Sequence, residues 1–167
     1  VEAVSDGIPN FREPAQKNAK RVLYLLAGLV FGGIAVIGTE FGTDIGGAVI
    51  NARDAAPLCA GLLFGGPAGI LAGLVGGVER WFSVYWGVGS YTRLACTLAT
   101  ILAGFFGAAL RKYLLEDQRP SWFYGLFAGV VMEVLHMLLI FLTHMSDIAR
   151  VFAFVEGCTL PMICLNS

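Results

Sequence analysis

The chain has 167 residues, of which 57% are hydrophobic and only 14% are charged, whereas soluble domains carry about 25% charged residues. This composition indicates a polytopic helical membrane protein, or a large piece of one. The net charge is −1 and no run of basic residues occurs, which argues against nucleic acid as a partner.

The order of apolar and polar segments predicts an all-α fold with about five visible transmembrane helices in the lipid bilayer. Residues 1–21 are expected to form a polar, membrane-flanking loop, and 22–167 a transmembrane domain whose last span is truncated. The chain lacks an initiator Met and a signal-peptide pattern and stops within an apolar segment, so we expect more protein on both sides. In chain order, the predicted spans cover about 22–38, 55–78, 92–110, 122–143 and 151 onward.

The connections between these spans differ in character. Residues 38–54 are rich in glycine and carry four ionisable groups without a helical period, which predicts a loop or partly unwound backbone lining a cavity. Residues 79–93 are rich in aromatic side chains, as at a membrane interface, and 111–120 are expected to be a polar loop. If five spans alternate, the basic residues of 12–21 and Arg150 lie on the side opposite those of 111–119. The charges then mildly favour the first group inside.

The second span carries a glycine at every fourth position from Gly61 to Gly77. On a helix this spacing keeps the glycines near one face, so that another helix can approach almost backbone to backbone. Pro67 removes a backbone donor within this run. Either the helix divides at Gly66 and Pro67, leaving a positive dipole end near mid-membrane, or it continues with a proline kink.

Two arginines, Arg53 and Arg80, bracket the second span. Arginine presents a planar fork of donors that matches a carboxylate, so two arginines facing one cavity would select a small organic acid. Alternatively, Arg53 pairs with Asp54 or Asp44, and Arg80 with Glu79, as anchors of helix ends. A continuous helix from 53 to 80 would be about 40 Å long, so a shared site requires the segment to be broken or folded back.

A second polar group lies in the later spans. Glu133 and His136 are three residues apart and therefore share a helix face, from which they could couple a proton, a cation or a hydrogen bond to Glu156. The alternative is a polar network that holds helices together. No metal site is predicted from these residues.

The four cysteines show no CxxC spacing and no paired histidines, which predicts buried thiols rather than a disulfide framework or a zinc site. A nucleophile with a nearby base and orienting acid is not apparent, so no catalytic residue is assigned and no cofactor is expected. The cysteines are Cys59, Cys96, Cys158 and Cys164.

Several motifs resemble the membrane region of LytS-type proteins, the five-transmembrane sensor module. They are Gly38-Thr39, Asn51-Ala-Arg53, Gly61-Leu-Leu-Phe-Gly-Gly-Pro67-Ala-Gly69, Gly73, Gly77, Arg80, Ala95-Cys96-Thr-Leu, Ala103-Gly104 and Pro161-Met-Ile-Cys-Leu-Asn-Ser167. The resemblance implies a bacterial inner-membrane input domain, with one further span before Val1. It also implies a cytoplasmic GAF, histidine kinase or diguanylate cyclase part, a homodimer, and a response regulator as partner of the kinase.

The resemblance further implies a ligand, since some members of the family sense pyruvate or similar small carboxylates. It assigns the ligand to Arg53, Arg80 and Cys96, with Asn51 in the same motif. Where a serine is common, this chain has Ala99, and Thr97 and Thr100 are the substitute hydroxyls. The resemblance also places the loop 111–119 in the cytoplasm, against the charge argument above.

Two other classes of function remain as alternatives. The first is a membrane transporter or a solute-binding subunit for a small anion, because carriers also use broken helices and charges at mid-membrane. The second is a purely structural membrane subunit.

Overall fold

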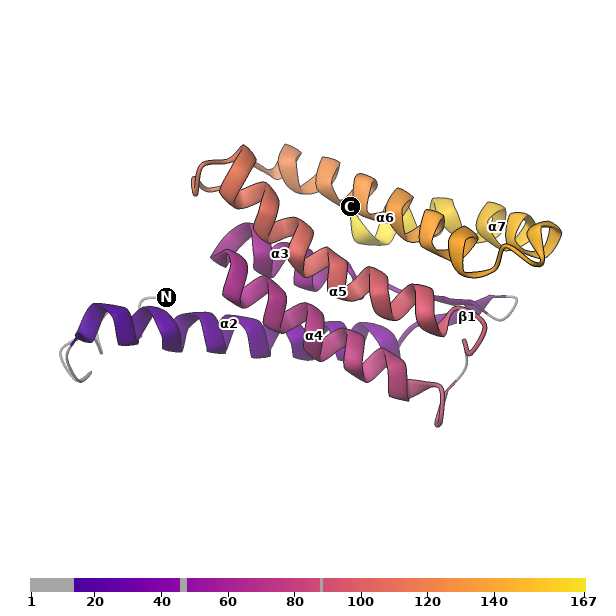
Figure 1. Cartoon of the computed structure of the whole chain (residues 1–167), viewed down its shortest axis with the longest axis horizontal. Coiled ribbons are helices and arrows are strands. Elements are labelled where there is room, and N and C mark those ends of the chain that lie inside the picture. Colours follow the sequence, from indigo (N-terminus) through magenta and orange to yellow (C-terminus); the bar gives the residue numbers. More distant parts are fainter. Residues whose placement is uncertain (1–13, 46–47, 88) are drawn as a thin grey trace.

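A computed structural model describes residues 14–45, 48–87 and 89–167 (Figure 1). The expectation for 1–21 therefore falls partly outside the described residues. Helix α2 (Ala15–Glu40) already includes Lys17, Lys20 and Arg21. The remaining elements are β1 (Thr43–Ile45), β2 (Ala48–Ile50), α3 (Ala55–Phe64), α4 (Gly66–Ser83), α5 (Arg93–Ala109), the π-helical turn η2 (Leu110–Leu114), α6 (Trp122–Thr143) and α7 (Ile148–Asn166).

Four helices among the described residues are long and apolar enough to cross a membrane, namely α2, α5 with η2, α6 and α7. Helix α4 has 18 residues, which corresponds to a length of about 27 Å, whereas the 10-residue α3 reaches only about 15 Å. Large apolar side chains of α2 are exposed, as expected for a lipid-facing helix: Leu25, Leu29, Val30, Ile34 and Ile37. The fold is thus the all-α membrane architecture predicted from the sequence.

The segment predicted as the second span is broken and folded back. Gly65 has φ of +93°, a conformation that glycine adopts without steric cost, and it separates α3 from α4. Pro67 lies in the first turn of α4, where its missing N–H leaves no helical hydrogen bond unmade. The chain reverses here so closely that a Cβ atom on Gly69 would lie 2.6 Å from the Cα atom of Gly61. The open choice between a break and a kink is therefore settled as a break.

Glycines allow α3, α4 and α5 to pack at backbone distance, as the spacing predicts. A Cβ atom on Gly104 of α5 would overlap the carbonyl oxygen of Gly69 on α4. One on Gly61 of α3 would lie 2.6 Å from the backbone nitrogen of Ala108. One on Gly73 would lie 3.0 Å from the carbonyl oxygens of two residues on α5. In a membrane, such close contact stabilises helix association through dispersion attraction. Bulkier residues would keep the backbones apart and reduce it.

Arg111 fixes the C-terminal end of α3. Its Nη1 atom donates to the carbonyl oxygens of Leu62, at 2.9 Å, and of Leu63. A cation at this position satisfies carbonyl groups that have no partner within the helix and interacts favourably with the helix dipole. Residues 111–114 are helical, so the predicted polar loop is shorter than expected. The start of α4 lies beside Arg111 and not, as the broken-helix alternative supposed, near the middle of the bundle.

The helices place the chain connections at two ends of the bundle (Figure 1). At one end lie the start of α2, the reversal at Gly65 and the connection between η2 and α6. At the other end lie strands β1 and β2 and the residues 84–87, 89–92 and 144–147. We name them the basic end and the aromatic end. The basic end carries Lys17, Lys20, Arg21, Arg111, Lys112 and Arg119, and the aromatic end carries Trp81, Tyr85, Trp86 and Tyr91.

This arrangement corrects the charge argument made from the sequence. Counting 55–78 as one crossing put the basic residues of α2 and those of 111–119 on opposite sides. The reversal at Gly65 adds one change of direction, so both groups lie at the same end. Arg150 lies at the aromatic end, where its guanidinium carbon is 4.4 Å from the ring centroid of Tyr91. The guanidinium carbon of Arg93 likewise lies 4.0 Å from the ring centroid of Trp81.

A buried polar site between the broken segment and helices α5 and α6

Residues 51–54, between β2 and α3, form irregular backbone that helix α7 holds in place. The side chain of Asn166 donates from Nδ2 to the carbonyl oxygen of Asn51, at 2.9 Å, and accepts at Oδ1 from the N–H of Ala55, at 3.1 Å. The N–H of Asn51 points to the sulfur of Met162, at 3.4 Å. These bonds satisfy non-helical backbone within the protein, the condition under which it is tolerated at membrane depth.

The segment delivers Arg53 and Asp54 to the interior, and both are essentially inaccessible to solvent. Arg53 donates from Nε to Thr100 Oγ1, at 2.6 Å, and lies 3.2 Å from Asp54 Oδ1. Thr100 donates to the same carboxylate oxygen at 2.6 Å. The expected Arg53–Asp54 pair therefore exists, yet it engages only Nε. The terminal Nη1 and Nη2 atoms of Arg53 are buried and hydrogen-bond to no described residue.

Arg80, near the end of α4, is also buried, with 1% of its surface exposed. It donates to Ser83 Oγ at 3.1 Å and to the carbonyl oxygen of Gly89 at 2.6 Å, and its Nε atom has no described partner. The alternative pairing with Glu79 is not observed. Because α3 and α4 run in opposite directions, Arg80 returns to the end of the bundle that holds Arg53. The separation of about 40 Å that a continuous helix would impose between the two arginines is therefore absent.

Arg53 and Arg80 are both within electrostatic range of Cys96, on the first turn of α5, and of each other, although neither guanidinium group forms a hydrogen bond to the sulfur. Cys96 is 6% exposed. Two like charges buried together repel each other, and each retains donors without a described acceptor. An anion placed between them would relieve the repulsion and accept those donors.

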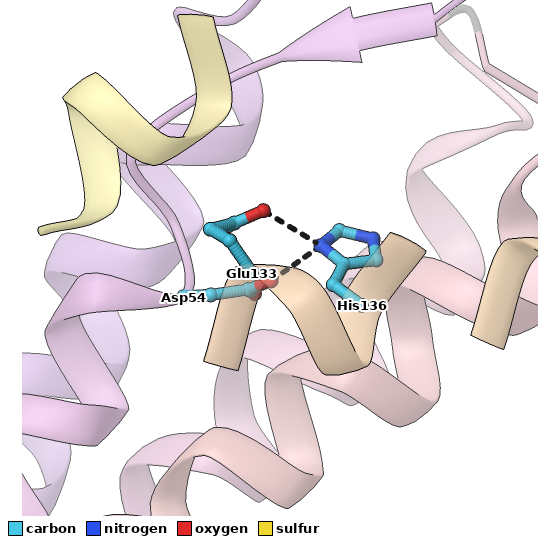
Figure 2. A group of neighbouring side chains, drawn as sticks. All are labelled: Asp54, Glu133 and His136. Atoms are coloured by element: carbon cyan, nitrogen blue, oxygen red, sulfur yellow. Dashed lines mark ion pairs between the residues drawn. The ribbon is translucent and has the colours of Figure 1, made fainter. Parts of the chain in front are cut away.

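His136 connects Cys96 to two carboxylates. Its Nε2 atom lies 3.4 Å from Cys96 Sγ, and its Nδ1 atom lies 3.0 Å from Asp54 Oδ2 and 3.6 Å from Glu133 Oε2. Figure 2 shows Asp54 approaching His136 from the segment before α3, while Glu133 and His136 project from neighbouring turns of α6. Ligand atoms of the three residues lie within 4.8 Å of one another, a spacing that a metal ion could bridge. Arg53 gives Asp54 a cationic partner from the chain itself, and the ring of His136 lies against both carboxylates.

The sequence reasoning missed part of this cluster. Glu156, expected to partner Glu133 and His136, is exposed, and Asp54 takes that position instead. The sequence also suggested no nucleophile with a base and an orienting acid, whereas Cys96, His136 and Asp54 form that arrangement. They come from three separate segments, so no local spacing connects them. The one available signal was Asp54 itself, a carboxylate adjoining the motif arginine.

The threonines and cysteines divide into different environments. Thr97 is buried with a hydroxyl that has no described hydrogen-bond partner, whereas Thr100 belongs to the Arg53–Asp54 pair. Ala99 lies in an apolar cluster with Leu58 and Ala103.

All four cysteines are free. Two are buried, but the expectation of four buried thiols is wrong, since Cys59 is partly buried and Cys164 is exposed.

A cavity of about 10 Å³ lies against Cys96 and His136, between β2, α5, α6 and α7. This is about the space of one water molecule, too small for an organic acid. The site is therefore closed, and any such ligand must displace surrounding side chains or helices. The other residues that line the cavity are Ile50, Thr92, Met137, Ile140, Phe154, Cys158 and Met162.

A multi-pass helical membrane domain with a buried cationic site is the class of protein that these observations define. The chain matches the family described as the 5TMR of 5TMR-LYT over residues 8–167, and it belongs to that family. Its relatives include the sensor histidine kinase YpdA of Escherichia coli K12, which is 31% identical over 131 residues. The sensor histidine kinases BtsS of Escherichia coli K12 and of Shigella flexneri are each 30% identical over 142 residues. No solved structure matches the chain.

The matches cover 78% of this chain and 22% of YpdA, and 83% of this chain and 24% of BtsS. The chain thus spans about a quarter of the length of these relatives. It is a multi-pass protein of the bacterial inner membrane and corresponds to the membrane sensor region of sensor histidine kinases.

Proposed function

We propose that this chain is the ligand-sensing input domain of a bacterial sensor kinase and that its ligand is a small carboxylate such as pyruvate. The burial of Arg53 and Arg80, each with donors that have no described acceptor, supports the proposal most strongly. A carboxylate would accept from Nη1 and Nη2 of Arg53 and from Nε of Arg80. Asn51 supports the site from behind, because its Oδ1 atom accepts from the N–H of Arg53 at 3.1 Å.

Ligand entry has a structural consequence because the cavity is closed. A molecule larger than water must separate some of β2, α5, α6 and α7, and the bound ligand then stabilises the separated arrangement. A ligand shifts a conformational equilibrium only by its difference in affinity for the two states. Here that difference comes from a site that is too small in one state and filled in the other.

Helix α7 is the element best placed to transmit the change. Asn166, at the end of α7, forms hydrogen bonds to Asn51, before Arg53, and to Ala55, after Asp54. A displacement of the segment between them therefore moves the end of α7. Gly129 of α6 permits the close approach, since a Cβ atom there would meet the carbonyl oxygen of Asn166. In a longer protein, α7 would pass this shift to a cytoplasmic kinase domain that works as a homodimer and phosphorylates a response regulator.

Binding calorimetry on the full-length protein in lipid nanodiscs tests the carboxylate site. Pyruvate and a panel of mono- and dicarboxylates are titrated into the wild type and into Arg53→Lys, Arg80→Lys and Arg150→Gln variants. Lysine keeps the charge but loses the fork, so we expect about a tenfold or greater loss of affinity in the first two variants. Arg150→Gln is the matched control, because this arginine also lies at the aromatic end but packs outside the site. Absence of saturable carboxylate binding to folded wild type refutes the proposal.

The same preparation separates a sensor from a transporter. In sealed vesicles a sensor binds its ligand without net flux, whereas a carrier accumulates it. Time-dependent uptake of labelled pyruvate that Arg53→Lys abolishes would assign the chain to the transporter class instead.

A further inference from the structure

Cys96, His136 and Asp54 have the mutual geometry of a nucleophile, a base and an orienting acid. Sγ of Cys96 lies 3.4 Å from Nε2 of His136, and the other ring nitrogen faces Asp54 Oδ2 at 3.0 Å. A carboxylate this close to Nδ1 favours the proton on that nitrogen, although the two atoms do not align as a hydrogen bond, and leaves Nε2 to accept the thiol proton. The proposed binding of a carboxylate by the arginines makes no use of these three residues.

We propose that Cys96 adds reversibly to the carbonyl carbon of a 2-oxo acid bound in this site, forming a hemithioketal. The inference rests on the proposed function, because the two arginines must first hold the ligand's carboxylate. In a 2-oxo acid the carbonyl carbon adjoins the carboxylate. Arg53 donates to Thr100, one helical turn beyond Cys96 on α5, so a carboxylate held by Arg53 presents its carbonyl carbon toward the sulfur.

The step balances without any additional reactant. As the Sγ–C bond forms, the thiol proton moves to Nε2 of His136, and the π pair of the carbonyl moves onto its oxygen. That oxygen then takes the proton from Nε2. An S–H bond and a C=O π bond are replaced by an S–C bond and an O–H bond, with no oxidation or reduction. The reverse sequence releases the ligand, as a sensor of a fluctuating metabolite requires.

The surroundings of the sulfur favour this chemistry and restrict the ligand. Arg53 and Arg80 stabilise negative charge that develops on the sulfur and on the carbonyl oxygen. The cavity against Cys96 and His136, whose lining does not include the arginines, is largely apolar, with Met137, Ile140 and Met162 among its residues. It suits a methyl or another small apolar substituent on the carbonyl carbon and disfavours a second carboxylate.

The decisive observation is the ¹³C resonance of pyruvate labelled at its carbonyl carbon and bound to the full-length wild type in nanodiscs. A hemithioketal moves this resonance from the ketone region to that of a tetrahedral carbon bearing oxygen and sulfur. We expect the shifted signal in the wild type and in Cys164→Ser, whose thiol is exposed. We expect it to be absent in Cys96→Ser and Cys96→Ala. An adduct that survives in Cys96→Ser and disappears in Cys158→Ser would overturn the assignment to Cys96.

Lactate supplies a comparison that separates the two proposals, since it has the same carboxylate without a carbonyl. We expect the ratio of pyruvate affinity to lactate affinity to fall about tenfold or more in Cys96→Ala. The substitution removes the bond between Sγ and the carbonyl carbon of pyruvate, and lactate forms no such bond in either protein. Bound pyruvate that keeps its ketone resonance in the wild type refutes the covalent step and leaves the carboxylate site standing. If neither acid binds to folded wild type, the proposed function and this inference fail together.

Discussion

At the scale of single residues, Thr100 orients the guanidinium group of Arg53 by binding its Nε atom. Its hydroxyl accepts from Arg53 Nε and donates to Asp54, so an uncharged group braces the direct contact of 3.2 Å between Arg53 Nε and Asp54 Oδ1. This leaves the outer part of the guanidinium group without a described acceptor. Thr97, one residue beyond Cys96 on the same helix, makes no such contact. The two threonines, which look alike in the sequence, therefore do different things.

Replacing Thr100 by valine should lower the stability of the protein more than the same change at Thr97. Valine has a similar shape but leaves the Arg53 Nε and an Asp54 oxygen without their hydroxyl partner, which costs about 1–3 kcal/mol for buried groups. Thermal unfolding in nanodiscs measures the difference. Thr100→Ser, which restores the hydroxyl, should recover most of the loss. Equal effects of the two valine variants would contradict this account of Thr100.

Sequence reasoning was better at naming cations than at naming their partners. The arginines and Cys96 stand in motifs, and the structure does bring them together. The roles of Asp54 and His136 depend on which helices are neighbours, because Cys96 and Asp54, two of the three residues that His136 contacts, lie far from it along the chain. Glu156 was expected at the site for its proximity in sequence to α6, but the rotation of α7 turns it outward.

At the scale of elements, the close packing of α4 on α5 depends on the absence of a Cβ atom at a few positions. At Gly104 the obstructing atoms belong to the backbone of Gly69, which cannot rotate away as a side chain can. At Gly125 in α6 a Cβ atom would meet nothing within 4 Å. Glycines that the sequence presents alike thus fall into two groups.

Gly104→Ala should therefore separate α4 from α5 and destabilise the fold by about 1–3 kcal/mol, as overpacking does. Gly125→Ala should be neutral or slightly stabilising, because alanine is the better helix former. The midpoint of thermal unfolding of each variant, compared with the wild type, gives the answer. A Gly104→Ala variant as stable as the wild type would show that the packing of these helices is looser than described.

The glycine spacing was sufficient to predict this close packing, but not which elements take part. The apolar pattern predicts one span over 55–78 and leaves open whether its helix divides at Gly66 and Pro67 or continues with a kink. What it could not reveal is that Gly65 adopts a positive φ and that Arg111, 46 residues later, binds the carbonyl groups at the end of α3. That long-range contact stabilises a helix end that the local sequence leaves ambiguous.

At the scale of the whole molecule, positive charge is distributed unequally. All three lysines lie at the basic end with Arg21, Arg111 and Arg119. At the aromatic end, Arg93 and Arg150 are packed on aromatic rings, and Arg53 and Arg80 are buried in the site. Cytoplasmic connections of membrane proteins carry the excess of lysine and arginine. We therefore expect the basic end to face the cytoplasm, in agreement with the placement of 111–119 that the family resemblance implies, and the closed site to lie nearer the outer side of the membrane.

This orientation predicts a labelling pattern in intact cells. In a background without cysteine, Gln16→Cys and Gln118→Cys should both be protected from a membrane-impermeant maleimide, whereas Met145→Cys should react. All three side chains are exposed in the structure. A fold with a continuous helix over 55–78 would place Gln16 and Gln118 on opposite sides. Reaction of only one of these two would therefore contradict the reversal at Gly65.

The folded-back helix α3 also bears on how the protein enters its membrane. With 10 residues and a charged pair immediately before it, α3 is too short to be integrated as an independent span. Its packing partners include α5, and its last carbonyl groups bind Arg111, both synthesised later than α3 itself. Insertion of this segment must therefore wait until the polypeptide up to Arg111 has been made. The buried polar site, to which Arg53 and Asp54 belong, is consequently assembled late in biogenesis, although these two residues emerge early from the ribosome.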